Sequence, residues 1–224
     1  MKNKKRLIAS VIINFIVFAV TTGVVISYFL GNLGSYVKSP ADKFMFFTTD
    51  SNILAAAGAL AIGICNIRIL KGKEKSIPKP VMIFKLMGVA SLLLTFSTVM
   101  ILLIPVYGPA MQLGGTAFHM HVGAPAMCFI SFVFLDGFGK ISLPYSLAGA
   151  IPMLIYGAVY LYNVVFIGYS NGGWFDFYAL NRNGQWYISL IIMLSSTLTL
   201  SLLTLLIHNK FFKKSGFILE KNKI

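Results

Sequence analysis

Six long apolar segments, separated by short polar stretches, dominate the chain. They cover residues 7–30, 45–70, 81–106, 116–135, 144–166 and 187–207. Each is close to or above the roughly 20 residues that a helix needs to cross about 30 Å of hydrocarbon. Helices satisfy their own backbone hydrogen bonds in lipid, and the alternating segments of a β-barrel do not occur. The pattern predicts an all-α membrane protein built as a bundle of six transmembrane helices.

Composition supports this interpretation. Hydrophobic residues make up 57% of the chain and charged residues 11%, against about 25% charged residues in soluble domains. So few charges cannot cover a water-facing surface. The basic start of the chain resembles a signal peptide, but the first apolar segment is too long and lacks a convincing cleavage site, so we expect a retained helix. No linker divides the sequence, and residues 1–224 are expected to form one domain.

The distribution of positive charge predicts the orientation. With the N-terminus inside, 16 of the 19 lysine and arginine residues fall in the cytoplasmic pieces 1–6, 68–85, 136–143 and 208–224. This bias is the positive-inside pattern of membrane proteins, and both termini are expected in the cytoplasm. The topology therefore accounts for the net charge of +13, and no nucleic-acid partner is expected.

Two polar clusters open the second and the fourth segments, at residues 46–52 and 118–125. The alternating direction of the helices puts both openings at the outer side of the membrane. We therefore expect the clusters to lie at similar depth, within about two helical turns of the interface. Polar groups inside a membrane are costly, which makes these clusters candidates for function.

Helical spacing sorts the members of the clusters by face. One small and polar face of the second segment holds Thr48, Ser51, Asn52, Ala55 and Ala59. Asp50 lies about 200° round from Thr48, so it faces another neighbour or the interface near Lys43. In the fourth segment His121 shares a face with Cys128, and His119 points elsewhere. Pro125 has no N–H, which leaves the carbonyl of His121 without its helical partner and predicts a kink or an ordered water there.

A hydroxyl and an imidazole at one depth suggest nucleophilic catalysis. A threonine hydroxyl attacks only when a base removes its proton, and neutral histidine is the usual base near pH 7. Thr48 and His121 supply these groups, and Asn52 or Ser51 could donate a hydrogen bond to an oxyanion. The alternatives are structural hydrogen bonds between helices and a binding site for transport. The inner halves of the helices look poorer in polar groups, which favours an outward-facing site over a transport path.

Metal and haem sites fit the sequence less well. His119 and His121 diverge on a helix, although Asp50 or Asp176 could complete a metal site with them. His208 lies near the inner end of the last segment, too far away for a bis-histidine haem. The two cysteines, Cys65 and Cys128, lie in apolar runs without metal-ligand spacing. No metal or other cofactor is expected.

The longest outer loop, residues 167–186, is rich in aromatic side chains. Such residues often form a belt at the membrane interface, which is the interpretation we favour. The alternative is a lid over a site.

Three stretches of the sequence are similar to a known family. FFTTDSNIL at 46–54, HVGAP at 121–125 and LPYSLAGAIPMLIYGAVY at 143–160 resemble signatures of bacterial six-span relatives of the androgen-induced gene 1 family. Eukaryotic members look like intramembrane threonine hydrolases that cleave fatty-acid esters of hydroxy fatty acids. The resemblance implies Thr48 as the nucleophile and His121 as its base.

We therefore expect a hydrolase of lipid esters in the bacterial plasma membrane, with membrane lipids as its surroundings and a lipid ester as its substrate. Thr49 is the alternative nucleophile, because the two threonines leave the register ambiguous by one residue. The side chains expected to contact substrate are Thr49, Asp50, Ser51, Asn52 and His119. A small-molecule or lipid transporter that uses the same polar cluster is the alternative function.

Overall fold

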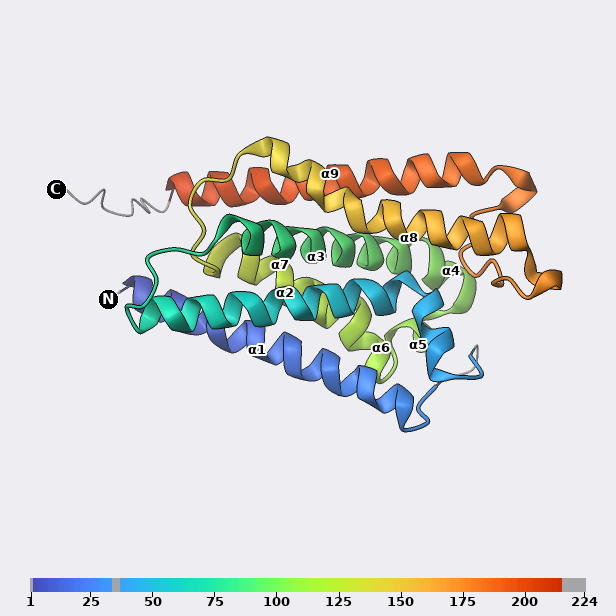
Figure 1. Cartoon of the computed structure of the whole chain (residues 1–224), viewed down its shortest axis with the longest axis horizontal. Helices are drawn as coiled ribbons and strands as arrows, with labels where there is room; N and C mark the ends of the chain where they lie inside the picture. The colour runs from blue at the N-terminus through green and yellow to red at the C-terminus, as the bar shows by residue number, and fades with distance from the viewer. Residues whose placement is uncertain (1, 34–36, 215–224) are drawn as a thin grey trace.

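A computed structural model describes residues 2–33 and 37–214 of the chain. All of the regular secondary structure in these residues is helical, and they contain no strand. Six of its helical spans are long and apolar enough to cross a membrane: Lys4–Phe29, Phe47–Leu70, Lys79–Tyr107, Thr116–Leu135, Leu143–Ile167 and Trp186–Phe212. They match the six predicted segments to within a few residues, which confirms the predicted fold class. α1 begins and α9 ends at the same end of the bundle (Figure 1).

Three spans are single α-helices and three contain π-helical turns. The uninterrupted helices are α1 (Lys2–Phe29), α2 (Phe47–Leu70) and α9 (Trp186–Lys214). The third span joins α3 (Lys79–Thr98), η2 (Val99–Leu103) and α4 (Ile104–Tyr107). The fourth joins α6 (Thr116–Phe118), η3 (His119–Gly123), α7 (Ala124–Ile130) and η4 (Ser131–Leu135). The fifth joins η5 (Leu143–Ala150), α8 (Ile151–Leu161) and η6 (Tyr162–Ile167). Short connecting helices are η1 (Pro40–Met45), α5 (Pro109–Leu113), η7 (Tyr169–Asn171) and η8 (Arg182–Gly184).

α3 is the central helix of the bundle. It packs against α2, α7, α9 and η5, and Figure 1 shows it between α2 on one side and α8 and α9 on the other. Gly88 lets α3 approach α2 closely, since a Cβ added there would lie only 2.8 Å from the Cα of Ala55. Small residues at helix contacts are typical of membrane bundles, where close packing replaces the hydrophobic effect as the force between helices.

α1 presents one face to the bundle and the other to the surroundings. Its buried positions recur every three or four residues: Ser10, Asn14, Val17, Thr21, Val24 and Tyr28. The positions between them expose large apolar side chains, including Ile12 and Ile26. This pattern fits a helix that packs on protein along one face and on lipid along the other.

A buried polar network lies near the end at which α1 begins, which we call the inner end in line with the predicted orientation. The fully buried Lys85 ammonium donates to Asn14 Oδ1 at 2.7 Å. Asn14 Nδ2 and Ser10 Oγ donate to the buried Asp136 carboxylate at 2.8 and 2.6 Å. Asn66 Nδ2 donates to Ser10 Oγ at 2.8 Å. These contacts join α1, α2, α3 and the end of the fourth span.

This network corrects two predictions from the sequence. The inner halves of the helices are not poor in polar groups, because five buried polar side chains meet there. Lys85 was expected in the cytoplasmic piece 68–85 but lies inside α3. The positive-inside bias does not depend on Lys85, because it is only one of the 16 lysine and arginine residues counted on that side, and the others remain there.

Candidate active site

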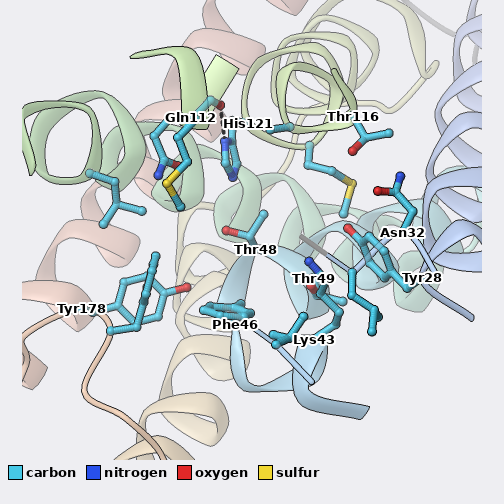
Figure 2. A pocket seen from close by; sticks show the side chains of 17 residues that line it. Tyr28, Asn32, Lys43, Phe46, Thr48, Thr49, Gln112, Thr116, His121 and Tyr178 are labelled. Atoms are coloured by element: carbon cyan, nitrogen blue, oxygen red, sulfur yellow. Dashed lines mark hydrogen bonds between the residues drawn. The ribbon is translucent and has the colours of Figure 1, made fainter. Parts of the chain in front are cut away.

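A cavity of about 290 Å³ opens near the outer end of the bundle. Its walls come from α1, α2, the region 111–121 and the loop before α9. Figure 2 shows its lining side chains, among them Tyr28, Lys43, Thr48, Thr49, Gln112, His121 and Tyr178. The two polar clusters predicted to share a depth therefore meet here: Thr48 comes from the first turn of α2, and His121 from η3.

The π-helical turn η3 sets the direction of His121. At its end the amide of Ala124 bonds the carbonyl of His119, five residues back. Pro125 has no N–H for the carbonyl of His121, and its ring crowds that carbonyl, so a widened turn relieves both problems. A kink or an ordered water was predicted beside His121, and the structure has this π-helical turn there. His121 is buried and its ring points into the cavity toward Thr48 (Figure 2).

A backbone carbonyl fixes the tautomer of His121. Its Nδ1 lies 2.6 Å from the carbonyl oxygen of Gln112. A carbonyl oxygen only accepts hydrogen bonds, so Nδ1 carries the hydrogen and donates. Nε2 then keeps its lone pair on the opposite edge of the ring, which faces the cavity. A histidine held in this way is ready to act as a base.

Two glycines allow the chain to deliver this carbonyl. Between α5 and α6 the backbone turns back at Gly114 and Gly115. Gly115 has a φ of +53°, and a Cβ at Gly114 would lie 2.6 Å from the carbonyl oxygen of Ala110. Residues 107–115 therefore form more than the short outer turn that the sequence suggested, because the buried Gln112 joins the cavity wall.

The hydroxyl of Thr48 lies beside the phenol of Tyr178. The amide of Phe47 donates to the Tyr178 oxygen at 3.1 Å. Burial raises the pKa of Tyr178 to about 12, and hydrogen bonds from Thr48 and from the backbone oppose this rise only in part. Tyr178 is thus a neutral hydrogen-bond donor at ordinary pH.

The cavity carries one cation. The Lys43 ammonium lies 4.8 Å from the centroid of the Tyr28 ring, a cation–π arrangement. Burial lowers the pKa of Lys43. Among the described residues Lys43 forms no ion pair. An anionic group that enters the cavity would therefore find an uncompensated positive charge. Thr49, the alternative nucleophile, also lines this cavity but is nearly fully buried beside Tyr28.

Ser51 and Asn52 share the buried face of α2, as predicted, but do not line the cavity. Ser51 Oγ lies 2.9 Å from Thr95 Oγ1 on α3 and donates to the carbonyl of Thr48. Asn52 Nδ2 donates to the carbonyls of Thr48 and Met120 at 2.8 and 3.0 Å. Both hydrogens of that amide are engaged between α2 and η3. The structure therefore does not support the expected oxyanion or substrate contacts for these two residues.

Asp50 and His119 also lie away from the cavity. Asp50 faces α8 rather than Lys43, in a separate cavity. His119 Nε2 lies 3.0 Å from Thr21 Oγ1 and links the fourth span to α1. The expected substrate contacts of both residues in the Thr48–His121 cavity are therefore not supported.

The loop at 167–186 covers the cavity instead of forming only an interfacial belt. Phe177 and Leu180 are buried, and Phe177 and Tyr178 line the cavity wall. Asp176 holds this conformation, because its carboxylate accepts hydrogen bonds from the Tyr160 hydroxyl and from the amides of Leu180 and Asn181. The lid alternative is thus the better description of this loop.

No protein-family model, curated protein or solved structure matches the chain. Within residues 2–33 and 37–214 no three histidine, cysteine, aspartate or glutamate side chains are grouped so as to hold a metal ion.

Proposed function

We propose that the protein is an intramembrane hydrolase of lipid esters, with Thr48 as nucleophile and His121 as base. The observation that carries the proposal is the pose of His121. Its Nδ1 is held by the Gln112 carbonyl, and its free Nε2 faces the cavity whose opposite wall bears Thr48. A nucleophile, a base and an orienting group are the three parts that this type of catalysis needs.

The proposed reaction proceeds in two steps. Thr48 Oγ1 attacks the ester carbonyl carbon while Nε2 of His121 takes the hydroxyl proton. The tetrahedral intermediate collapses, the C–O bond to the alcohol breaks, and His121 returns the proton to the leaving alkoxide. Water, activated by the same Nε2, then attacks the acyl-threonine ester. Its collapse releases the fatty acid and restores the Thr48 hydroxyl.

Tyr178 is the proposed oxyanion donor. Its phenol lies beside Thr48 and stays neutral up to high pH, so it has a hydrogen to donate to an oxyanion. A donor placed at the developing negative charge is worth about 10²–10³ in kcat. Ser51 and Asn52, the donors expected from the sequence, are committed to interhelical bonds.

The charge of the cavity favours an ester that also carries an anionic group. Lys43 is the only lysine or arginine in the lining and has no acidic partner there. Apolar lining residues, including Leu103 and Met120, provide surface for the acyl chains. The resemblance of 46–54 and 121–125 to threonine hydrolases of the androgen-induced gene 1 family supports the same class of substrate. We propose the bacterial plasma membrane as the location.

Transport of a lipid or small molecule is the second candidate. The inner network around Lys85 and Asp136 favours it, because a transporter needs polar groups toward both sides. None of the side chains of that network lines the Thr48–His121 cavity. This separation is why we favour hydrolysis over transport.

The proposal is tested with purified full-length protein in detergent. The protein is incubated with a fluorophosphonate probe, and the labelled residue is mapped by mass spectrometry. In parallel, release of fatty acid from a fatty-acid ester of a hydroxy fatty acid is measured. Labelling at Thr48 that disappears in His121→Ala supports the mechanism. Uptake of a fluorescent lipid into proteoliposomes without ester cleavage would instead support transport.

A further inference from the structure

A second cavity of about 290 Å³ lies between α2, α8 and the loop before α9. It shares no lining residue with the Thr48–His121 cavity. The α2 side chains that face it follow helical spacing: Phe47, Asp50, Ser51 and Leu54. Phe47, Asp50 and Leu54 lie on another face of α2 from Thr48, and Ser51 lies between the two faces, so the two cavities flank the same helix turn.

The walls of this second cavity are rich in aromatic rings. Phe44, Phe47, Tyr156 and Trp174 all line it. The rings of Phe47 and Tyr156 pack against each other with centroids 5.0 Å apart. Both are buried, so they form a fixed part of the wall.

Asp50 carries the only side-chain acceptor in the described lining of this cavity that has no hydrogen-bond partner. Ser51 bonds Thr95 and the Thr48 carbonyl, and the Tyr156 hydroxyl donates to the carbonyl of Met45 at 2.8 Å. The half-buried carboxylate of Asp50 has neither a hydrogen bond nor an ion pair with any residue that the structure describes. A carboxylate in the first turn is favoured by the helix dipole, but that effect does not explain why an aromatic-lined cavity surrounds it.

We propose that this cavity binds a quaternary ammonium group. A primary ammonium has three N–H donors, and those that point away from the Asp50 carboxylate would face aromatic and apolar walls without an acceptor. A methylated ammonium has no N–H to satisfy. Its positive charge is attracted by the Asp50 carboxylate and by the faces of aromatic rings. The charge of the cavity selects a cation, and its lack of further acceptors selects the methylated cation over the primary ammonium.

The position of the cavity allows two sources for such a ligand. Ile155 and Val159 line it and are largely exposed on the surface of α8, so a lipid headgroup of the phosphatidylcholine type can reach it from the membrane side. Trp174 belongs to the outer loop, so a free quaternary amine can reach it from the aqueous side. The binding site is independent of the proposed ester hydrolysis.

Fluorescence of Trp174 provides a direct test. The chain has two tryptophans, so Trp186→Phe leaves Trp174 as the sole tryptophan reporter. This full-length variant, in nanodiscs of phosphatidylglycerol, is titrated with tetramethylammonium and with ammonium at constant ionic strength. A second arm replaces part of the lipid by phosphatidylcholine. We expect a saturable change with tetramethylammonium or phosphatidylcholine, and at least tenfold weaker binding of ammonium. A response to phosphatidylcholine alone identifies the lipid as the source, and a response to tetramethylammonium alone identifies the free amine.

Three further variants separate charge and aromatic contact from folding. Asp50→Asn should weaken binding at least tenfold, and Phe44→Leu, at a partly exposed wall position, several-fold. Glu74→Gln, which removes a carboxylate paired with Arg68 outside the cavity, should bind as the parent protein does. Helix content and elution volume check that each variant folds, and Asp50→Ser replaces Asp50→Asn if the latter does not. Equal binding of ammonium and tetramethylammonium, equal binding by Asp50→Asn, or no saturable response to either ligand overturns the proposal.

Discussion

The ammonium of Lys85 and the carboxylate of Asp136 are both fully buried, and the side chain of Asn14 joins them, with bonds of 2.7 and 2.8 Å. Three different spans thus supply the cation, the anion and the bridge. Ionisable groups inside a membrane persist only when they are paired or hydrogen-bonded. This network links α1, α3 and the end of the fourth span at the inner end.

Removal of Lys85 should destabilise the bundle strongly. Lys85→Ala leaves the Asp136 carboxylate buried without the cation that Asn14 bridges to it. We expect a loss of about 3 kcal/mol in the free energy of unfolding, which is the lower end of the range for broken buried ion pairs. The loss is at the lower end because Arg6 also attracts Asp136. Thermal unfolding in detergent measures the loss. Lys79→Ala, an exposed position at the start of the same helix, is the matched control and should change stability by less than about 0.5 kcal/mol. Equal unfolding temperatures for the two variants would contradict this account.

Alanine at Thr48 or at His121 should abolish ester hydrolysis while helix content stays unchanged. Loss of a general base alone lowers the rate by about 10²–10⁴, and the double variant should lose little more, because the pair acts as a unit. Thr48→Ser keeps the hydroxyl and should retain part of the activity. The Thr49→Ala variant tests whether Thr48 or Thr49 is the nucleophile. Activity lost in Thr49→Ala and kept in Thr48→Ala would move the nucleophile by one residue.

Tyr178→Phe should lower kcat by about 10²–10³ with a small change in KM, because the donor acts on the transition state. Its raised pKa, about 12, means that the donating neutral form persists well above pH 10. The rate, after subtraction of spontaneous hydrolysis, should therefore show no alkaline decline near pH 10, the ordinary pKa of tyrosine. Tyr169→Phe, at an exposed loop position, is the control. A decline centred near pH 10 would exclude Tyr178 as the donor.

Gly88→Ala should weaken the packing of α3 on α2. Its Cβ would meet the backbone of Ala55 at 2.8 Å, and overpacking of this kind costs about 1–3 kcal/mol. Gly23→Ala provides the comparison, because no atom lies within 4 Å of the Cβ position at Gly23 on α1. There the greater helix propensity of alanine should leave stability unchanged or improved. Chemical denaturation of both variants in mixed micelles measures the difference.

The orientation is open to cysteine labelling, because both native cysteines are buried. An impermeant maleimide added to intact cells should label Asn171→Cys in the outer loop. It should label Lys73→Cys, in the turn between α2 and α3, only after the membrane is permeabilised. The reverse pattern would place the Thr48–His121 cavity on the cytoplasmic side and would contradict the charge-based prediction.

Hydrophobic length predicted the six spans because the thickness of the bilayer imposes it. The shared depth of the two polar clusters likewise predicted that Thr48 and His121 line one cavity. The burial of Lys85 was not predicted because this residue follows a basic loop in the sequence, and its burial depends on Asn14 and Asp136 in other spans. The place of Tyr178 in the site was not predicted because the loop at 167–186 has no periodic pattern, and the conformation of that loop depends on the hydrogen bonds that Asp176 makes.

The group that orients His121 is a backbone carbonyl, and this determines which sequence positions natural selection would conserve to keep the contact. Every amino acid at position 112 presents a carbonyl, so that position is free to vary without loss of the contact to Nδ1. Gly114 and Gly115 are different, because a side chain at either one obstructs or strains the turn that delivers the carbonyl. In homologous sequences that keep the orienting contact, we therefore expect a conserved pair of glycines rather than a conserved polar residue.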